Sequence, residues 1–268
     1  MLNMIIDTHA HYDEEAFDAD RDEFLTSLPS FGIGAVVNVG ASMEGARESV
    51  SYARHYEHVY CAVGLHPDHV GLLEEKPEET MEELCTLAQD PKCVAIGEIG
   101  LDYYWHVESR DIQKKWFAKQ MELSRKLNLP INVHSRDAAA DTLALVREVH
   151  EGGPGGIIHC FSGSVEMAKE YVKMGYYIGV GGVVTFRNAK TLQHVVEEIP
   201  LEYLVTETDC PYLAPVPYRG KRNRSDYLPL VVEKIAQIKG IENEQAERAL
   251  FENAGKVYGK INIPAEYH

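Results

Sequence analysis

Short apolar segments alternate with longer segments of helical periodicity along most of the chain. Eight short segments are strand candidates, and several of them are rich in Val and Ile and lack the regular polar alternation of a half-exposed strand. Strands buried on both faces, as in a parallel sheet, have this pattern. The predicted strands are residues 4–7, 35–39, 59–63, 94–96, 131–133, 156–158, 176–180 and 203–206.

Each predicted strand is followed by a segment in which apolar residues recur at helical spacing. In the clearest one, Ile112, Trp116 and Met121 fall on one face. The predicted helices are residues 18–28, 43–56, 77–89, 111–127, 137–150, 165–174, 189–198 and 226–239, with a last one at 243–258. Eight strand–helix units indicate an α/β fold, a single-domain (β/α)₈ TIM barrel spanning residues 1–268. The first strand carries no G-x-G-x-x-G motif, which disfavours a dinucleotide-binding fold.

Composition narrows the classes of substrate and the cellular compartment. With 26 Lys and Arg against 42 Asp and Glu, the formal net charge is −16. Such a chain repels nucleic acids and anionic membranes on average, so a polyanionic substrate needs a local basic patch or bound cations. No apolar run is long enough to span a membrane, and the first residues do not resemble a secretory signal. Five cysteines without C-x-x-C spacing favour a reducing, cytoplasmic location over a disulfide framework.

Side chains able to bind metal stand at the ends of five predicted strands. The active face of a (β/α)₈ barrel is the C-terminal end of its strands. His9 and His11 follow the first strand, and residues two apart share a face of a strand. Glu98 follows the fourth strand, where a buried carboxylate needs a partner or a metal. The full set is His9, His11, Glu98, His134, His159 and Asp209.

Four histidines and two carboxylates exceed the needs of one tetrahedral ion and suit two divalent ions that share a carboxylate. Each residue alone could be a packed histidine or a turn cap, but their common position favours a metal site. Magnesium, manganese or zinc is expected, with zinc or nickel possible in the purified protein because both bind such sites tightly. Water activated between two cations hydrolyses esters, most naturally phosphoesters.

Seven motifs resemble those of the TatD-type metal-dependent hydrolases and deoxyribonucleases, in the family's order and across nearly the whole chain. They are residues 6–11, 63–67, 97–104, 134–138, 159–164, 207–213 and 219–223. The family usually continues the last motif with Glu-Pro, whereas this chain has Arg224 and Ser225. This departure leaves the metal-binding residues intact and concerns the local loop and its substrate contacts.

The resemblance implies a TIM barrel of the amidohydrolase-like superfamily with a pair of divalent metals. It assigns His9, His11, Glu98 and Asp209 to one ion, and Glu98, His134 and His159 to the other. Glu98 would bridge the ions and Asp209 would take the proton of the attacking water, so these two are the expected catalytic residues. The implied activity is that of a DNase, often a 3′–5′ exonuclease, with single-stranded DNA or 3′ ends as substrate.

Three further residues are expected around the ligands. Glu207 shares a strand face with Asp209, one layer deeper, and Glu207 and Asp102 are predicted to hydrogen-bond ligand histidines. His66 ends the third strand and is either a substrate contact or a turn residue before Pro67. Five other histidines are predicted at the surface, namely His55, His58, His150, His194 and His268.

A basic cluster follows the last predicted strand. Arg219, Lys221, Arg222 and Arg224 lie within six residues. A solvated loop is the simpler interpretation, but in a chain this acidic the cluster favours a phosphate-binding loop. Arg136, two residues after a predicted ligand, is expected to assist.

Three functions remain open from the sequence. The first is a metal-dependent nuclease that acts on DNA. The second is a hydrolase of a small ester, lactone or amide that uses the same two metals. The third is a metal-stabilised binding barrel without activity, which a missing ligand would favour, but no ligand is missing. No obligate protein partner is indicated.

Overall fold

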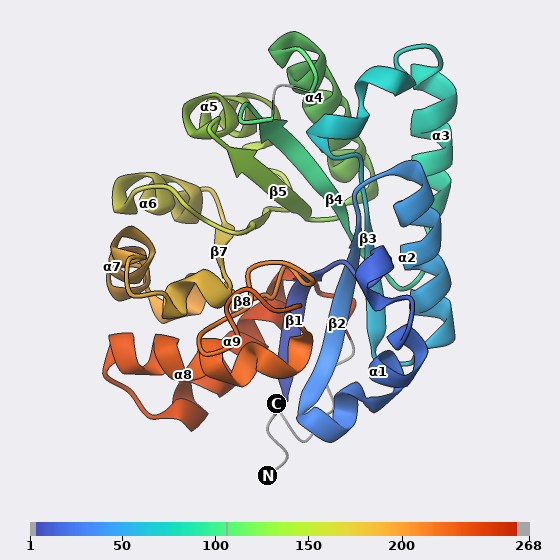
Figure 1. Ribbon diagram of the computed structural model, residues 1–268. Coiled ribbons are helices and arrows are strands. Elements are labelled where there is room, and N and C mark those ends of the chain that lie inside the picture. The colour runs from blue at the N-terminus through green and yellow to red at the C-terminus, as the bar shows by residue number, and fades with distance from the viewer. Residues whose placement is uncertain (1–3, 106, 262–268) are drawn as a thin grey trace.

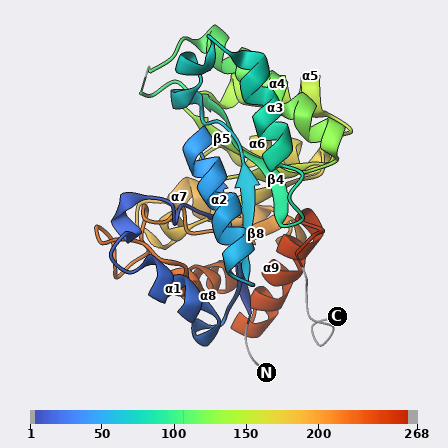
Figure 2. The ribbon, with the colours of Figure 1, turned by 90° about the vertical axis from the view of Figure 1, so that its right-hand side faces the viewer.

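The computed structural model describes residues 4–105 and 107–261, and its eight parallel strands form a barrel surrounded by helices (Figure 1; Figure 2). The strands follow one another around the barrel in chain order. They are β1 Ile5–Ala10, β2 Ile33–Gly40, β3 Val59–Val63, β4 Cys93–Asp102, β5 Ile131–Arg136, β6 Gly156–Ile158, β7 Tyr176–Val180 and β8 Leu204–Thr206. The predicted (β/α)₈ barrel is therefore confirmed.

The helices lie on the outside of the barrel at the predicted places (Figure 1). They are α1 Arg21–Ser27, α2 Met43–His55, α3 Pro77–Leu87, α4 Arg110–Leu127, α5 Ala139–His150, α6 Val165–Lys173, α7 Lys190–Glu198, α8 Leu228–Lys239 and α9 Asn243–Val257. Short 3-10 helices are η1 Glu15–Phe17, η2 Leu28–Phe31, η3 Pro67–His69, η4 Gly71–Leu73, η5 Gly182–Thr185, η6 Leu201–Tyr203 and η7 Ser225–Tyr227. Among the described residues, no helix combines the length and apolarity needed to cross a bilayer.

Local sequence explains where the longest helix begins and ends. Ser109 caps α4 by accepting a hydrogen bond from the Ile112 backbone N–H, and Asn128 ends it in the left-handed region at φ 51°. In the predicted apolar stripe of this helix, Trp116 and Met121 are fully inaccessible and Ile112 is half-buried. Burial of such a stripe against the sheet supplies most of a helix's stability in a barrel.

Two apolar clusters hold the layers together. The larger one lies between the strands and the surrounding helices. The smaller one joins inward-facing residues such as Ile6 and Val37 to the C-terminal helix α9, which covers one end of the barrel. Tyr258, just after α9, is buried there and donates a hydrogen bond of 2.8 Å to the Thr8 carbonyl. The apolar interior leaves the opposite end of the strands for polar chemistry.

The first and last strands meet at that polar end. His11 N donates to the Cys210 carbonyl, and Asp209 N donates to the His9 carbonyl, each at 2.9 Å. These bonds join the end of β1 and the residue after it to the segment that follows β8. Residues from the two ends of the chain are thereby brought to one place.

The predicted surface histidines divide into several groups. His55 and His194 are exposed and His58 is half-buried. The prediction for His150 is wrong, because hydroxyl groups on α4 and β7 contact both of its ring nitrogens and the residue is buried. His268 lies outside the described residues.

Candidate metal centre

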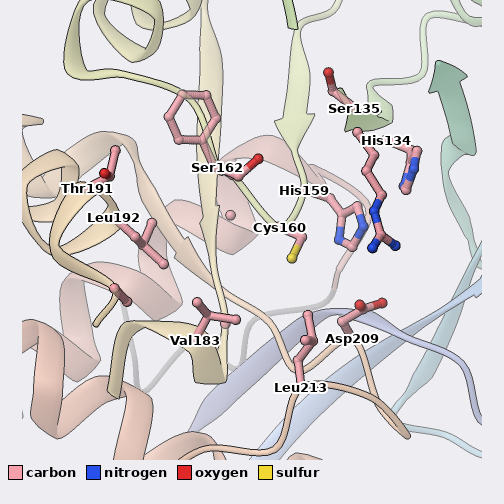
Figure 3. A pocket seen from close by; sticks show the side chains of 15 residues that line it. His134, Ser135, His159, Cys160, Ser162, Val183, Thr191, Leu192, Asp209 and Leu213 are labelled. Carbon is pink, nitrogen blue, oxygen red and sulfur yellow. The ribbon is translucent and has the colours of Figure 1, made fainter. Parts of the chain in front are cut away.

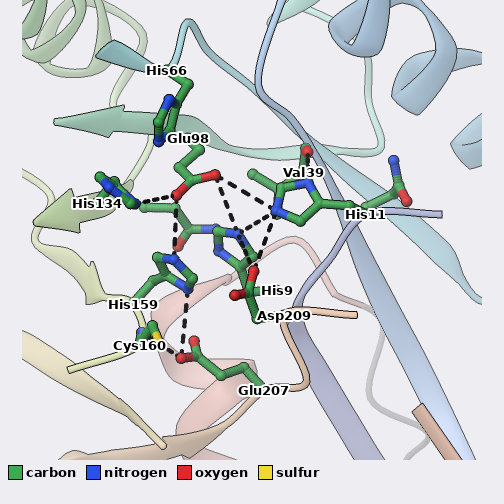
Figure 4. A network of polar contacts seen from close by, with 12 residues as sticks. His9, His11, Val39, His66, Glu98, His134, His159, Cys160, Glu207 and Asp209 are labelled. Atoms are coloured by element: carbon green, nitrogen blue, oxygen red, sulfur yellow. Dashed lines mark hydrogen bonds and ion pairs between the residues drawn. The ribbon is translucent and has the colours of Figure 1, made fainter. Parts of the chain in front are cut away.

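Irregular strand pairing directs two predicted ligands into the barrel mouth. Between residues 7 and 10, β1 advances three residues while β2 advances two. Between residues 96 and 99, β4 likewise advances three residues while β5 advances two. An extra residue of this kind bends a strand and re-aims its side chains. His9 and Glu98 lie within these two bulges and both point to the centre of the mouth (Figure 4).

Glu98 is the central group of the site (Figure 4). Its Oε2 lies 3.6 Å from the Nε2 atoms of both His9 and His11. Its Oε1 lies 2.8 Å from His134 Nδ1 and 3.2 Å from His159 Nε2. Each carboxylate oxygen therefore faces one pair of histidines, as expected for a group placed between two ions.

Asp209 completes the half of the site formed by β1 and the segment after β8. Its Oδ1 lies 3.5 Å from His11 Nε2 and 4.0 Å from His9 Nε2. The potential ligand atoms form overlapping groups, each within 4.8 Å, that include His9–His11–Asp209 and Glu98–His134–His159. The structure thus brings together all six side chains that the sequence singled out as metal ligands.

In two histidines, an acceptor contacts the ring nitrogen that faces away from the site. This contact determines which ring nitrogen carries the proton and leaves the lone pair on the nitrogen that faces Glu98. His11 Nδ1 lies 2.8 Å from the Val39 carbonyl, which can only accept, so this nitrogen carries the proton. His134 Nε2 lies 3.0 Å from Asp102 Oδ2. In the neutral rings, the lone pairs therefore lie on His11 Nε2 and His134 Nδ1, which face Glu98.

A second buried carboxylate stands behind His159. Glu207 Oε1 lies 3.6 Å from His159 Nδ1 and accepts a hydrogen bond of 2.5 Å from the Cys160 backbone N–H. Glu207 is completely buried. Asp102 and Glu207 thus occupy the places, next to ligand histidines, that the sequence predicted for them.

Opposite charges in the site stabilise one another. Burial lowers the pKa of His11, but Asp209 and Glu98 outweigh it and bring the pKa to about 9. Burial likewise lowers the pKa of His134, whereas Asp102 and Glu98 raise it to about 9 overall. Burial raises the pKa of Glu98, yet the surrounding histidines hold it well below its ordinary value. Glu98 is therefore ionised at neutral pH, and a divalent metal that bound here would displace the protons of these histidines.

The residues present fit a pair of divalent metals. Four imidazoles and two carboxylates converge, and in the described ranges no lysine or arginine forms an ion pair with Glu98 or Asp209. Nitrogen and oxygen donors of this kind suit zinc, manganese and related ions. The barrel and this donor set at its mouth define the class of metal-dependent hydrolases built on a (β/α)₈ scaffold.

Comparison with known proteins identifies the family within that class. A sequence model described as TatD related DNase matches residues 6–259. The chain belongs to the TatD family and is a metal-dependent hydrolase.

Relatives of known sequence and structure resemble it over nearly their full length. An uncharacterized metal-dependent hydrolase, YabD of Bacillus subtilis (strain 168), is 40% identical over 260 residues, which cover 97% of this chain and 100% of the relative. A protein named 3′-5′ ssDNA/RNA exonuclease TatD, from Cronobacter sakazakii, is 33% identical over 255 residues, 93% of this chain and 95% of the relative. The crystal structure of YjjV, a TatD homologue of Escherichia coli K12, superposes with a TM-score of 0.87 at 29% identity, covering 98% and 100% of the two chains.

Two predicted substrate contacts lie beside the metal centre. The His66 and His134 rings are edge-to-face with their centroids 4.4 Å apart, and burial next to His134 lowers the pKa of His66 to about 3. The Arg136 guanidinium lies 4.1 Å from the Tyr104 ring centroid and 5.2 Å from that of Trp105. A neutral imidazole and an arginine stacked on two aromatic rings therefore form one edge of the mouth.

Carboxylates engage half of the predicted basic cluster. Arg222 forms a two-pronged ion pair with Asp20, with Nη1 2.7 Å from Oδ1. Arg224 pairs in the same way with Asp226. Arg222 ties the loop to the segment before α1, Arg224 pairs within its own segment, and the charge of both is already compensated.

The other two cations of the cluster differ from this pair. The Arg219 guanidinium lies 4.5 Å from the Phe186 ring centroid. Within the described parts of the chain, no carboxylate lies in ion-pairing distance of Arg219 or Lys221. Their charge is therefore available to a phosphate.

A buried carboxylate that sequence reasoning overlooked organises the segment after β8. Asp7 accepts hydrogen bonds from Thr208 N at 3.0 Å, Thr208 Oγ1 at 2.7 Å and Ser225 Oγ at 2.6 Å. Thr208 directly precedes Asp209, so these bonds fix the backbone that carries a ligand. The first motif contains Asp7, but nothing in the sequence linked it to Ser225, 218 residues later.

Proposed function

We propose that the protein is a divalent-metal-dependent exonuclease that cleaves phosphodiester bonds of single-stranded DNA, in the 3′–5′ direction. The observation that carries the proposal is the position of Glu98, whose two oxygens each face a pair of ligand histidines. Relatives from Cronobacter sakazakii and Escherichia fergusonii are named 3′-5′ ssDNA/RNA exonuclease. RNA is therefore included in the test below.

Two ions, of magnesium, manganese or zinc, are proposed to bind the overlapping ligand sets. When bound, they would acidify a water molecule and neutralise charge on the phosphate. Burial raises the pKa of Asp209, but the hydrogen bond with His11 and the charges of the other histidines outweigh burial and lower the pKa overall. The carboxylate is therefore ionised and can accept the proton of the attacking water. Asp102 and Glu207 orient the histidines behind which they stand.

Substrate binding is proposed to depend on local features, because the chain as a whole carries a net charge of −16. Tyr104 and Trp105 are 49% and 58% exposed, and with Arg136 they offer a stacking surface for unpaired bases. Arg219 and Lys221 are proposed to contact the backbone phosphates.

The remaining predicted substrate contacts receive separate roles. His66, beside the His134 ring, is proposed to contact the phosphate that lies at the metals. Arg222 was predicted to bind substrate as well, but because Asp20 engages it, we assign it to holding the loop. The five cysteines are all free thiols, which supports the proposal of a reducing, cytoplasmic location.

The decisive experiment uses chelator-stripped protein and single-stranded DNA or RNA labelled at either end. Magnesium, manganese and zinc are added separately, and Glu98→Ala is assayed in parallel to exclude a contaminating nuclease. Stepwise shortening from the 3′ end that is absent in the variant is the expected result. No cleavage with any metal, together with hydrolysis of a small ester, lactone or amide, would replace the nuclease with the alternative hydrolase.

A paired substitution tests the proposed phosphate contacts. Replacing both Arg219 and Lys221 by glutamine should lower turnover of DNA several-fold and weaken its salt dependence, because fewer counterions are released on binding. Turnover of methyl p-nitrophenyl phosphate serves as the reference, and Arg248→Gln with Lys256→Gln on α9 is the matched control. An equal loss of turnover on DNA and on the small diester would contradict contacts between these two side chains and the DNA phosphates.

A further inference from the structure

A cavity of about 430 Å³ opens directly beside the metal centre (Figure 3). His134, His159 and Asp209 line it on one side. Thr191 and Leu192, from the first turn of α7, lie across the cavity from these ligands (Figure 3). Its size falls within the range of pockets that enclose small organic molecules. A group held there is therefore next to any bond hydrolysed at the metals.

The wall opposite the metals carries no charge. Val183, Ala189, Thr191 and Leu192 form it, from η5 and the start of α7. None of these side chains is ionisable, and Val183 and Leu192 give the wall an aliphatic surface against which a neutral ring can pack. The wall therefore suits a neutral group.

The remaining lining combines apolar surface with hydroxyl groups. Phe161 and Leu213 add an aromatic ring and an aliphatic side chain, and Ser135 and Ser162 add hydroxyls. A hydroxyl can both donate and accept a hydrogen bond, so it matches the polar edge of any nucleobase. A flat ring with a polar edge fits this lining better than an acyl chain, which would leave the hydroxyls without partners.

We propose that the cavity receives the terminal nucleoside of the strand, with the adjoining phosphate at the metal centre. This inference rests on the proposed function and specifies how its substrate is bound. Arg136 also lines the cavity and stacks on Tyr104 and Trp105, so the next base meets an aromatic surface at the cavity's edge. The cavity accommodates one nucleoside, and a base held in a duplex cannot enter it.

Two consequences distinguish this arrangement from a simple open groove. Cleavage releases mononucleotides from an unpaired end, since one nucleoside is enclosed at a time. All four bases are accepted with similar efficiency, because hydroxyls rather than fixed donors face the base edge.

Filling the cavity tests the proposal. Thr191→Trp places an indole in it, whereas the neighbouring Lys190→Trp is the matched control because Lys190 is exposed and does not line the cavity. We expect the ratio of kcat/KM for single-stranded DNA to that for methyl p-nitrophenyl phosphate to fall at least about tenfold in Thr191→Trp, the equivalent of one lost stacking contact. The ratio in Lys190→Trp should equal that of the unaltered protein.

A binding measurement on the unaltered protein removes dependence on the folding of the variant. Deoxynucleoside 5′- and 3′-monophosphates are compared with the corresponding deoxyribose phosphates as inhibitors of methyl p-nitrophenyl phosphate hydrolysis. The better nucleotide should inhibit at concentrations about tenfold or more below those of its base-free analogue, because only the nucleotide places a base in the cavity.

The results of these experiments distinguish a failure of the nucleoside pocket from a failure of the proposed exonuclease activity. Equal inhibition by nucleotides and base-free phosphates overturns the nucleoside pocket, as does DNA turnover that Thr191→Trp leaves unchanged. Hydrolysis of the small diester without any nuclease activity in the unaltered protein overturns the proposed function and the pocket's assignment with it. If Thr191→Trp is unstable in a thermal melt, the inhibitor comparison alone decides.

Discussion

The two halves of the metal centre are held in different ways. On the β5–β6 side, a carboxylate stands behind each ligand histidine, and Asp102 Oδ2 lies 3.0 Å from His134 Nε2. On the β1–β8 side, the group behind His11 is the neutral backbone carbonyl of Val39. A charged acceptor makes an imidazole a stronger base and a stronger metal ligand than a neutral one does.

The β1–β8 side uses its own buried carboxylate for another purpose. Asp7 accepts hydrogen bonds from Thr208 and Ser225, and so fixes the backbone next to Asp209 rather than a histidine ring. We therefore expect side-chain support on one half to set how strongly a metal binds. We expect backbone support on the other half to position Asp209, the proposed proton acceptor. Substitutions should separate these two effects.

The largest effect is expected where the halves share a residue. Glu98→Ala removes the oxygens that face both histidine pairs, so metal binding on both sides and all turnover should be lost. Elemental analysis of protein dialysed against metal, together with the DNA assay, measures both. The exposed Glu83→Ala is a suitable control. A variant that keeps two metals per chain would show that Glu98 does not bridge.

The next largest effect is expected on the β1–β8 side alone. Asp209→Asn keeps the size of the side chain but removes its basic oxygen, so kcat should fall roughly 10²–10⁴-fold. The metal bound on the β5–β6 side should remain, as elemental analysis can establish. Retention of full activity in this variant would eliminate Asp209 as the proton acceptor.

A smaller effect, confined to the β5–β6 side, is expected from Asp102→Asn. The amide can still contact His134 but carries no charge, so metal affinity on this side should fall about 10–100-fold. Excess metal should then restore kcat, which distinguishes weakened binding from a damaged reaction. The half-exposed Asp141→Asn serves as the control. Loss of activity that no metal concentration restores would place Asp102 in the chemistry itself.

The smallest effect is expected from changing the hydrogen bonds to Asp7, which hold the backbone next to Asp209. Ser225→Ala removes a 2.6 Å hydrogen bond to Asp7, which should lower stability by about 1–2 kcal/mol and kcat only a few-fold. Metal affinity on the β5–β6 side should be unchanged, since no predicted ligand on that side is touched. Isothermal titration with metal and thermal melts test both points, with the exposed Ser30→Ala as control. A change in metal affinity on the β5–β6 side would mean that the two halves are not independent.

The barrel could be predicted from the sequence because the patterns that indicate its strands and helices lie within short segments of the chain. Val- and Ile-rich segments and the apolar stripe of α4 follow from the periods of strands and helices. The six predicted metal ligands were chosen from their positions at strand ends, and the structure brings their side chains together. The bulges in β1 and β4 were not predicted, because simple alternation was assumed and only the pairing of neighbouring strands reveals an extra residue.

Features that depend on residues far apart in the chain could not be predicted from the sequence. Arg222 was assigned to phosphate because its partner Asp20 lies about 200 residues away in the chain. His150 was placed at the surface because nothing nearby in the sequence shows that α4 and β7 contact both ring nitrogens. The cavity beside His159 likewise forms only when η5 and α7 come together.

The joining of the chain's first strand to its last has a consequence for synthesis on the ribosome. His9 and His11 leave the ribosome early, but the atoms that meet them, on Asp209 and Cys210, are translated about 200 residues later. Contacts so distant in sequence form late and slowly. During most of translation His9 and His11 belong to an unfinished site, so a nascent or truncated chain is inert, and catalytic competence itself reports that the barrel has been completed.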